Sequence, residues 1–369
     1  MLFKGTRSIG TLDYDKEKPH LDRITTLYEE HYRETDPEKR AAIYEEINRE
    51  SQLAAQYAIP NELDRIYNAM GGSGINAHTS NEETVYKVNL PANRLTQWAT
   101  IEAERFHDPV FRLFQSELEA VYEEKNGRLD NKNILIYNAV ITQMFKVHPY
   151  GQQPTIGTVD HLKNPSLEHM YAFYRTYYVP NNMAIIISGD INIPETIALI
   201  DEKFSFWEAK PLPEPKTWEE PPIQGVERVI VQYLGEEYVM LAFRTVPSTH
   251  EDVEALTLVD MTLANSTAGL IDLNLNQQQK VRQASASSSI YGVQNDYGFQ
   301  YLYGIPKQGQ TLEEVEQLLL DQLELLKQGQ FEDWIIPAII TDFKQSRKAG
   351  LERNGSRVSW MRMPEKIPV

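Results

Sequence analysis

Five prolines fall within twelve residues near the middle of the chain, at positions 211, 213, 215, 221 and 222. Each proline lacks a backbone N–H donor and fixes φ near about −65°, so neither an α-helix nor a central β-strand continues through such a segment. A proline-rich segment instead forms a stiff, extended linker. The chain has 369 residues, and a single hydrophobic core usually organises fewer residues than this. The sequence therefore predicts two domains, residues 1–210 and 226–369, joined by a linker over residues 211–225.

The chain is strongly acidic. It carries 36 Lys and Arg residues against 53 Asp and Glu residues, which gives a formal net charge of −17. Nucleic acids and anionic membranes attract basic surfaces, so this charge argues against both as partners. Cysteine is absent, which excludes disulfide bonds, thiolate metal sites, iron–sulfur clusters and a cysteine nucleophile. Any metal ion would have to be held by histidines and carboxylates.

No stretch of the sequence approaches the roughly 18 apolar residues that a transmembrane helix needs. The first ten residues also lack the apolar core of a signal peptide. We therefore expect no transmembrane segment. The compartment stays open between the periplasm and the cytoplasm.

Helical periodicity dominates the first half of the chain. Asp36 and Pro37 indicate a helix start, with Asp36 as the N-cap and Pro37 at the first helical position. Alternating polar and apolar residues predict strands at 75–79 and 84–88, and the apolar run 183–188 indicates a buried strand. Helices are expected within residues 14–58, and over 61–70, 93–106, 111–128, 134–145, 166–177 and beyond 194.

The same mixture returns after the linker. A capped helix is expected from Thr311, where Glu314 completes a capping box, to Gly329. Strands mixed with helices on both sides of the linker predict an α+β fold for each domain. The expected strands are 228–233, 239–244, 285–291 and 299–303, and the expected helix between them is 252–264.

Four glutamates lie on one predicted helix, SELEAVYEEKNGRLDN. Glu117 and Glu124 are two helical turns apart and share a face with Val121, whereas Glu119 and Glu123 lie elsewhere on the helix. A carboxylate on such a stripe can ligate a metal while a second carboxylate supports it. A solvated acidic helix is the simpler interpretation, and the helix taken alone favours it.

The eight histidines are scattered, and no two of them have the spacing of HExxH. Glu168 and His169 look like the end of the inverted zinc motif HxxEH, but Pro165 stands where its first histidine should be. The glycines at 71–74 are not followed by Lys-Ser/Thr and a helix, so they do not form a phosphate-binding loop. The serines at 285–289 lack the GxSxG pattern of a nucleophile elbow.

Four segments occur in one order along the chain: MLFKGT at 1–6, GGSGINAHTSNEETVY at 71–86, the acidic helix, and HPYGQQPTIGTVDHLKNPS with YYVPNNMAIIISGDIN within 148–192. Together they resemble the M16 zinc metallopeptidases, the insulinase and pitrilysin family. The first is similar to the segment that directly follows the family's HxxEH motif, and the second to its Gly-Gly-x-x-Asn-Ala-x-Thr-Ser block. The acidic helix matches the position of the third zinc ligand. Each motif alone is weak, but their order is specific, and the match covers most of residues 60–345.

The resemblance implies two M16-like α+β domains, each a mixed, largely antiparallel sheet with helices packed on it. It also implies a zinc-dependent endopeptidase that hydrolyses peptides or unfolded protein segments. By this resemblance, Zn²⁺ would be held by two histidines of an HxxEH motif and by Glu124 of this chain, and Glu117 would orient the ligands. The strand around Asn76, Ala77 and His78 would pair with an extended substrate by β-addition.

One implied residue matches its motif only in part. Arg282 corresponds to the arginine of an Arg…Tyr pair with which the family's second domain grips the substrate. The expected tyrosine is an alanine or serine in this sequence, and Tyr291 lies too far along the chain. The role of Arg282 in substrate binding therefore rests on half of a motif.

Two departures from the family shape the functional expectation. Residues 7–70 are much longer than the usual connection, which predicts a helical insertion. The HxxEH motif is missing, and its last histidine would fall just before Met1. We therefore expect a fragment, truncated at its start and within its second domain, and inactive on its own. The alternative is a non-catalytic M16-like partner subunit that binds polypeptide; in either case a second M16-like half or subunit is a possible partner.

Overall fold

The computed structural model describes residues 1–289 and 295–362. It contains two compact units. The first combines residues 1–78, 85–131 and 153–218, and the second combines residues 79–84, 132–152 and those from 219 onward. The sequence-based boundaries assigned residues 132–152 to the first domain, whereas in the structure they pack within the second unit.

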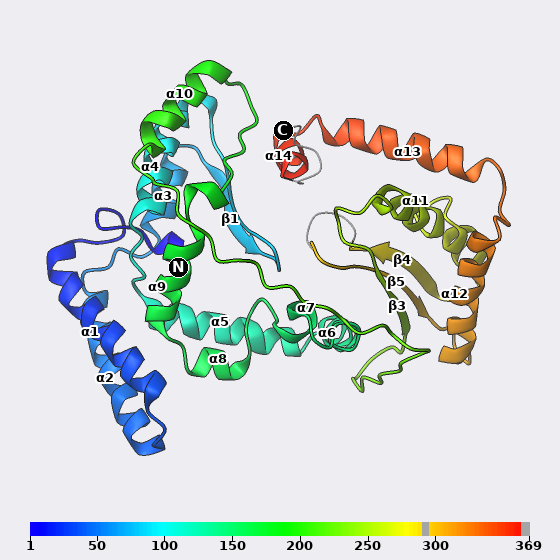
Figure 1. Ribbon diagram of the computed structural model, residues 1–369, viewed down its shortest axis with the longest axis horizontal. Coiled ribbons are helices and arrows are strands. Elements are labelled where there is room, and N and C mark those ends of the chain that lie inside the picture. The colour runs from blue at the N-terminus through cyan, green and yellow to red at the C-terminus, as the bar shows by residue number, and fades with distance from the viewer. Residues whose placement is uncertain (290–294, 363–369) are drawn as a thin grey trace. The chain divides into compact units, whose positions relative to one another are not determined.

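Helices make up most of the first unit (Figure 1). Strands β1 (Ser73–Thr79) and β2 (Thr84–Asn89) form a two-stranded sheet. All but one residue of each strand belongs to this unit. The 3-10 turns are η1 (Leu2–Lys4), η2 (Ala92–Arg94) and η3 (Pro180–Asn182). The helices are α1 (Tyr14–Arg33), α2 (Pro37–Ala55), α3 (Glu62–Ala69), α4 (Leu95–His107), α5 (Phe114–Leu129), α8 (Val159–Lys163), α9 (Leu167–Tyr177) and α10 (Ile193–Phe204).

Helices α1 and α2 form an antiparallel hairpin (Figure 1). The side chain of Asp36 caps α2 by accepting from two backbone N–H groups, and Pro37 occupies the first turn, as the sequence predicts. The hairpin buries Leu27 and Ile47 in one core with Phe114 of α5 and Leu167 of α9. The residues predicted to form a helical insertion are thus part of the hydrophobic core of this unit.

A buried ion pair joins α1 to the segment that precedes α5. Arg112 and Glu17 are 1% and 0% exposed, and the Arg112 Nε lies 2.9 Å from a Glu17 carboxylate oxygen. The same guanidinium donates to the backbone carbonyls of Lys4, Thr6 and Ile9 at 2.6–2.9 Å. With a second bond to Glu17, all five N–H donors of Arg112 are used. A buried charge is tolerated only when it is paired and fully hydrogen-bonded, and Arg112 meets both conditions.

Two glycines let the backbone come close enough for this arrangement. Gly5 and Gly10 have φ of 99° and 87°, in a region that L-residues rarely adopt. A Cβ at Gly5 would lie 2.1 Å from the carbonyl oxygen of Ile9, and a Cβ at Gly10 would lie 2.8 Å from the Arg112 guanidinium. A side chain at either position would therefore displace the loop from Arg112.

The second unit is built on a three-stranded antiparallel sheet in the order β3-β5-β4. Its strands are β3 (Val239–Thr245), β4 (Gln283–Ser288) and β5 (Gly298–Ile305), and a short π-helix is η4 (Asp272–Asn276). Its helices are α6 (Lys132–Met144), α7 (Pro149–Gln152), α11 (Val253–Leu263), α12 (Leu312–Lys327), α13 (Ile335–Gly350) and α14 (Asn354–Met361).

Both faces of the β3-β5-β4 sheet are covered. Leu302 of β5 packs with Leu263 of α11 and Leu319 of α12. The neighbouring Phe299 faces the other way and packs with Ile141 of α6. This alternation along one strand explains why residues 132–152 belong to this unit. The capping box that the sequence predicts at Thr311 and Glu314 is present at the start of α12.

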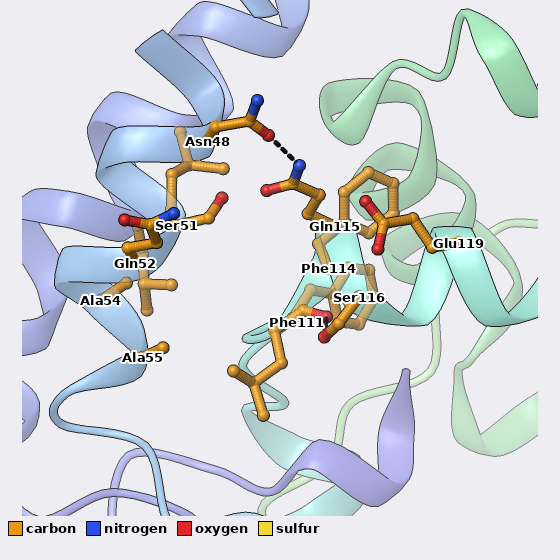
Figure 2. A pocket seen from close by; sticks show the side chains of 13 residues that line it. Asn48, Ser51, Gln52, Ala54, Ala55, Phe111, Phe114, Gln115, Ser116 and Glu119 are labelled. Atoms are coloured by element: carbon orange, nitrogen blue, oxygen red, sulfur yellow. Dashed lines mark hydrogen bonds between the residues drawn. The ribbon is translucent and has the colours of Figure 1, made fainter. Parts of the chain in front are cut away.

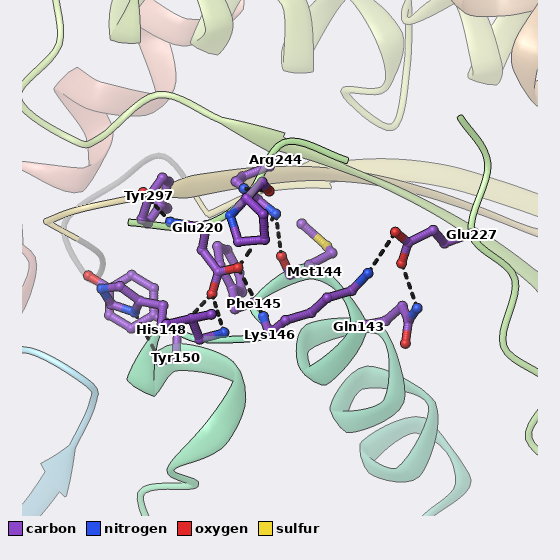
Figure 3. A network of polar contacts seen from close by, with 12 residues as sticks. Gln143, Met144, Phe145, Lys146, His148, Tyr150, Glu220, Glu227, Arg244 and Tyr297 are labelled. Atoms are coloured by element: carbon purple, nitrogen blue, oxygen red, sulfur yellow. Dashed lines mark hydrogen bonds and ion pairs between the residues drawn. The ribbon is translucent and has the colours of Figure 1, made fainter. Parts of the chain in front are cut away.

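A carboxylate from the proline-rich segment is buried in the second unit (Figure 3). The Glu220 side chain is 0% exposed and accepts from the backbone N–H groups of Lys146, Val147 and His148 at 2.5–3.0 Å. The guanidinium of Arg244 lies 3.9 Å away. Burial opposes ionisation of Glu220, but the three backbone donors and Arg244 outweigh it and lower the pKa of the carboxyl.

Two predicted strands are wrong. Residues 183–188 and 228–233 are neither helix nor strand and belong to neither sheet of the described residues. Ile185 is 45% exposed and Ile230 is 87% exposed, although the pattern predicted burial for the first of these segments. The physical reason is that a strand requires a neighbour to share its backbone hydrogen bonds, and apolar patterning alone does not supply one. The predicted strand at 285–291 is present as β4 up to Ser288, and its last two residues lie outside the described part of the chain.

Among the helices of residues 1–289 and 295–362, none has the length and apolar character to cross a membrane.

Replacing Arg112 with methionine should lower the free energy of unfolding by about 3–5 kcal/mol, because Glu17 would be left buried and unpaired. Urea denaturation followed by circular dichroism would measure the loss. Arg23→Met is the matched control, since Arg23 pairs with Glu46 at 3.0 Å between side chains that are both 44% exposed. The control should cost less than about 1 kcal/mol. Equal losses in the two variants would refute the anchoring role of Arg112.

Glu220→Gln should destabilise the protein at pH 7 by about 1–3 kcal/mol, because an amide NH₂ would then face a backbone N–H. The pKa of Glu220 is lowered on folding from its ordinary value of 4.5. Its stabilising effect is therefore complete above pH 4.5 and is lost as the pH falls through the folded-state pKa. Urea midpoints of the two proteins should converge on acidification.

Glu227→Gln, which alters an ion pair with Lys146 at the surface, is the control. A gap between wild type and Glu220→Gln that stays constant with pH would contradict the argument.

Candidate functional site: the acidic helix and its two sides

Helix α5 presents Glu117 and Glu124 on one side, as its periodicity predicts. Glu117 forms an ion pair with Lys4, with the ammonium nitrogen 2.7 Å from the carboxylate. Glu124 is 56% exposed and pairs with Arg128 one turn further along the same helix, also at 2.7 Å. Lys4 belongs to the loop held by Arg112, so the Arg112 contacts fix the chain segment that lies against Glu117.

The residues present do not make a zinc site by themselves. In the part of the chain that the structure describes, no three His, Asp or Glu side chains gather closely enough to hold a metal ion. A protein zinc site needs at least three such ligands, and cysteine is absent. His161 precedes the Glu168–His169 pair that looks like part of an inverted zinc motif. Its side chain completes the capping box of α8 together with Thr158. We therefore derive no chemical step through a metal from these residues.

The predicted substrate-binding residues lie on strand β1. Asn76 and His78 are exposed, and Ala77 between them is half-buried. The side chain of Asn76 accepts a hydrogen bond from the backbone N–H of Ala77 at 2.8 Å. Within the described residues β1 has one strand partner, β2. The other edge of β1 is thus not paired with a strand of residues 1–289 or 295–362, which is the arrangement that β-addition requires.

Arg282 lies just before β4, in the second unit. Its backbone N–H donates to the carbonyl of Ile305 at 3.0 Å, which continues the β4–β5 pairing. Its side chain is 64% exposed and forms an ion pair with Glu236. Tyr291, the other residue of the incomplete motif, lies outside the described residues.

The opposite side of α5 borders two pockets that the sequence did not predict. The first, of about 240 Å³, is lined by apolar and polar side chains of α1, α2 and α5 and the segment before α5, and among them Asn48 and Gln115 are hydrogen-bonded to each other (Figure 2). The second, of about 290 Å³, is lined by residues of α1, α2, α5 and α8. Glu119 borders both pockets. The only sequence signal was His31, a polar residue on the apolar stripe of α1.

Comparison with known proteins bears directly on this arrangement. Residues 165–342 match the family model described as the peptidase M16 inactive domain. The resemblance to the M16 peptidases is confirmed. Zinc protease PqqE of Helicobacter pylori is 25% identical over 301 residues, which cover 79% of this chain and 66% of that protein. The probable zinc protease PqqL of Escherichia coli is 30% identical over 174 residues, which cover 43% of this chain and 18% of that protein.

Solved structures support the same fold. A protease from Helicobacter pylori matches with a TM-score of 0.69 at 21% identity, covering 81% of this chain and 73% of that one. The periplasmic protease PqqL from Escherichia coli matches with a TM-score of 0.61 at 18% identity, covering 81% of this chain and 35% of that one. The M16-like α+β fold expected from the sequence is confirmed. The chain spans only part of the length of these curated relatives.

The chain of residues 1–369 should bind Zn²⁺ no more tightly than a generic acidic surface, because carboxylates scattered over a surface do not replace three converging ligands. Isothermal titration with zinc chloride should show weak binding without a defined stoichiometry. A one-to-one site of micromolar or tighter affinity would contradict this expectation and would direct attention to His161 and His169.

Proposed function

We propose that this chain is the polypeptide-binding part of an M16-type zinc peptidase acting on peptides or unfolded protein segments. The observation that carries the proposal is the M16 match over residues 165–342, together with relatives named zinc proteases. The strongly negative charge agrees with a polypeptide ligand rather than a nucleic acid.

Substrate binding is assigned to the edge of β1 that β2 leaves open. An extended peptide would pair there through main-chain hydrogen bonds, which recognise backbone rather than sequence. The exposed side chains of Asn76 and His78 would border the bound peptide. Arg282 is proposed as a further substrate contact within the second unit, where its guanidinium is paired with Glu236.

Hydrolysis requires more than these residues provide. The M16 resemblance assigns two zinc ligands and the general base to an HxxEH motif, which this sequence does not contain. We propose Glu124 as the third ligand and Glu117 as its supporting carboxylate in a protein that has the motif. Glu124 is 56% exposed, and its ion pair is with Arg128 on the same helix, so exchanging Arg128 for another cation would cost little.

A second candidate function is supported by a different observation. The matched family model is that of the inactive M16 domain, and the described residues contain no metal-binding group. Both fit a non-catalytic partner subunit that uses the M16 fold to hold polypeptide. The sequence encoded upstream of Met1 separates the two candidates, because an intact HxxEH motif supports the peptidase and a degenerate one supports the partner subunit.

In a protein that carries an HxxEH segment ahead of Met1, Glu124→Gln should abolish peptide hydrolysis and weaken zinc retention, since a neutral amide is a poor replacement for an anionic ligand. Glu117→Gln should cost about 10- to 100-fold, as expected for a residue that only orients ligands. Cleavage of an internally quenched peptide and zinc content after dialysis would measure both effects.

The controls for this series are Glu119→Gln and Glu123→Gln. They remove the same charge from the same helix, but they lie on the side that borders the pockets. Both should hydrolyse the peptide at close to the wild-type rate. Equal behaviour of all four variants would mean that α5 is merely an acidic helix and would overturn the assignment of Glu124.

A further inference from the structure

The 290 Å³ pocket in the first unit combines aromatic walls with acidic groups. Three tyrosines line it, Tyr28 from α1, Tyr44 from α2 and Tyr122 from α5. Glu119 and Glu123 add two carboxylates from α5. Both glutamates are exposed, so their charges stand where a ligand would enter from solvent.

Two buried polar atoms of the pocket-lining side chains have no partner. Tyr28 and His31 are 1% and 7% exposed, and both line the pocket. The Tyr28 hydroxyl and the His31 Nδ1 are buried and make no hydrogen bond with the residues that the structure describes. A buried polar group without a partner is destabilising, so two such atoms on side chains that line one cavity call for an explanation. A ligand that brings N–H donors into the pocket supplies one.

Both of these groups are neutral at physiological pH. Burial lowers the pKa of His31, and the nearby Arg40 adds to this effect. Burial also raises the pKa of Tyr28, with smaller contributions from Tyr44 and Glu119. A neutral imidazole has one nitrogen that accepts a hydrogen bond, and a tyrosine hydroxyl accepts as well as donates. Two of the side chains that line the pocket thus carry a hydrogen-bond acceptor, and the exposed glutamates add negative charge.

The protein already places one of its own cations against this wall. The ammonium of Lys163 lies 5.8 Å from the centroid of the Tyr122 ring, within the range of a cation–π contact. Lys163 also lines the pocket, so the charged groups there are two carboxylates and one ammonium. The charges of these lining side chains sum to −1, and Arg40, which does not line the pocket, adds a positive charge near His31.

We propose that this pocket binds the guanidinium group of an arginine side chain in a polypeptide. A guanidinium is planar, so it stacks on tyrosine rings. Its five N–H donors, spread in a fixed fork, reach several acceptors at once, whereas an ammonium acts as a compact point charge. It is also less strongly hydrated than an ammonium, which lowers the cost of entering a partly buried site.

The site is separate from the carboxylates assigned to the metal. Glu119 is two residues beyond Glu117, a rotation of about 200° around the helix axis, and so it faces the opposite side of α5. Binding of arginine at this pocket requires neither zinc nor hydrolysis. The failure of this proposal and the failure of the proposed peptidase function are therefore distinguishable.

The test is calorimetric titration of the protein with Nα-acetyl-arginine amide and with Nα-acetyl-citrulline amide. Citrulline has nearly the same shape but no charge, so the arginine derivative should bind at least about tenfold more tightly. Free arginine, with its uncapped charges, should bind no better than the capped form. Equal binding of the citrulline and arginine derivatives, or a clear preference for the free amino acid, would overturn the proposal.

Variants separate the pocket from a general charge effect. Glu119→Gln combined with Glu123→Gln should weaken binding of the arginine derivative about tenfold or more. Glu38→Gln combined with Glu45→Gln removes the same charge from exposed positions of α2 and should leave binding unchanged. Lys163→Met should strengthen binding, because it removes the competing cation from the Tyr122 face. Equal effects of the two double variants, or weaker binding by Lys163→Met, would refute the site.

Discussion

The fold of the first unit depends on the hydrogen bonds that the buried Arg112 guanidinium makes. Its five hydrogen bonds join three parts of the chain: the loop from Lys4 to Ile9, helix α1 through Glu17, and the segment that leads into α5. One backbone hydrogen bond, from the N–H of Val110 to the carbonyl of Gly5 at 3.1 Å, joins two of these parts, and the loop is neither helix nor strand beyond its first turn. A buried arginine joins all three because it can satisfy carbonyls and a carboxylate at once.

This interaction has a consequence for the proposed function. Arg112 holds the loop at the start of the chain, whose first residues resemble the segment directly after the M16 zinc motif. Lys4 of that loop forms an ion pair with Glu117 on α5. Any segment that joined the chain ahead of Met1 would therefore enter beside α5. In this account the ion pair orients the acidic helix toward the point where the histidines of an HxxEH motif would arrive. Glu17 belongs to the segment that is predicted to be a helical insertion, and its ion pair with Arg112 supports the loop from Lys4 to Ile9.

Helix α5 has two chemically different sides. One presents Glu117 and Glu124, which are held by ion pairs with neighbouring cations. The other presents Glu119 and Glu123 to a pocket with tyrosine walls and unpaired buried acceptors. Helical periodicity already separates the two pairs of glutamates in the sequence, and the structure adds that Glu119 and Glu123 border a pocket which α1 and α2 also line.

Much of the local structure was predictable because it depends on neighbouring residues. The Asp36 cap, the Thr311 capping box and strands β1 and β2 follow from spacing along the chain. The strands at 183–188 and 228–233 were mispredicted because their pattern says nothing about a pairing partner. Contacts between distant residues, such as Arg112 with Glu17 or Glu220 with the backbone at 146–148, were also missed. The sequence hinted at the contact between Arg112 and Glu17 only by placing an arginine within the apolar run VFRLF.

The most direct test of the account is anomalous diffraction at the zinc edge from crystals of the protein carrying an HxxEH segment ahead of Met1. The account predicts one zinc peak with a carboxylate oxygen of Glu124 about 2.0–2.2 Å away and the Arg128 side chain displaced from it. A zinc peak ligated by other residues, with Glu124 still paired to Arg128, would contradict the account.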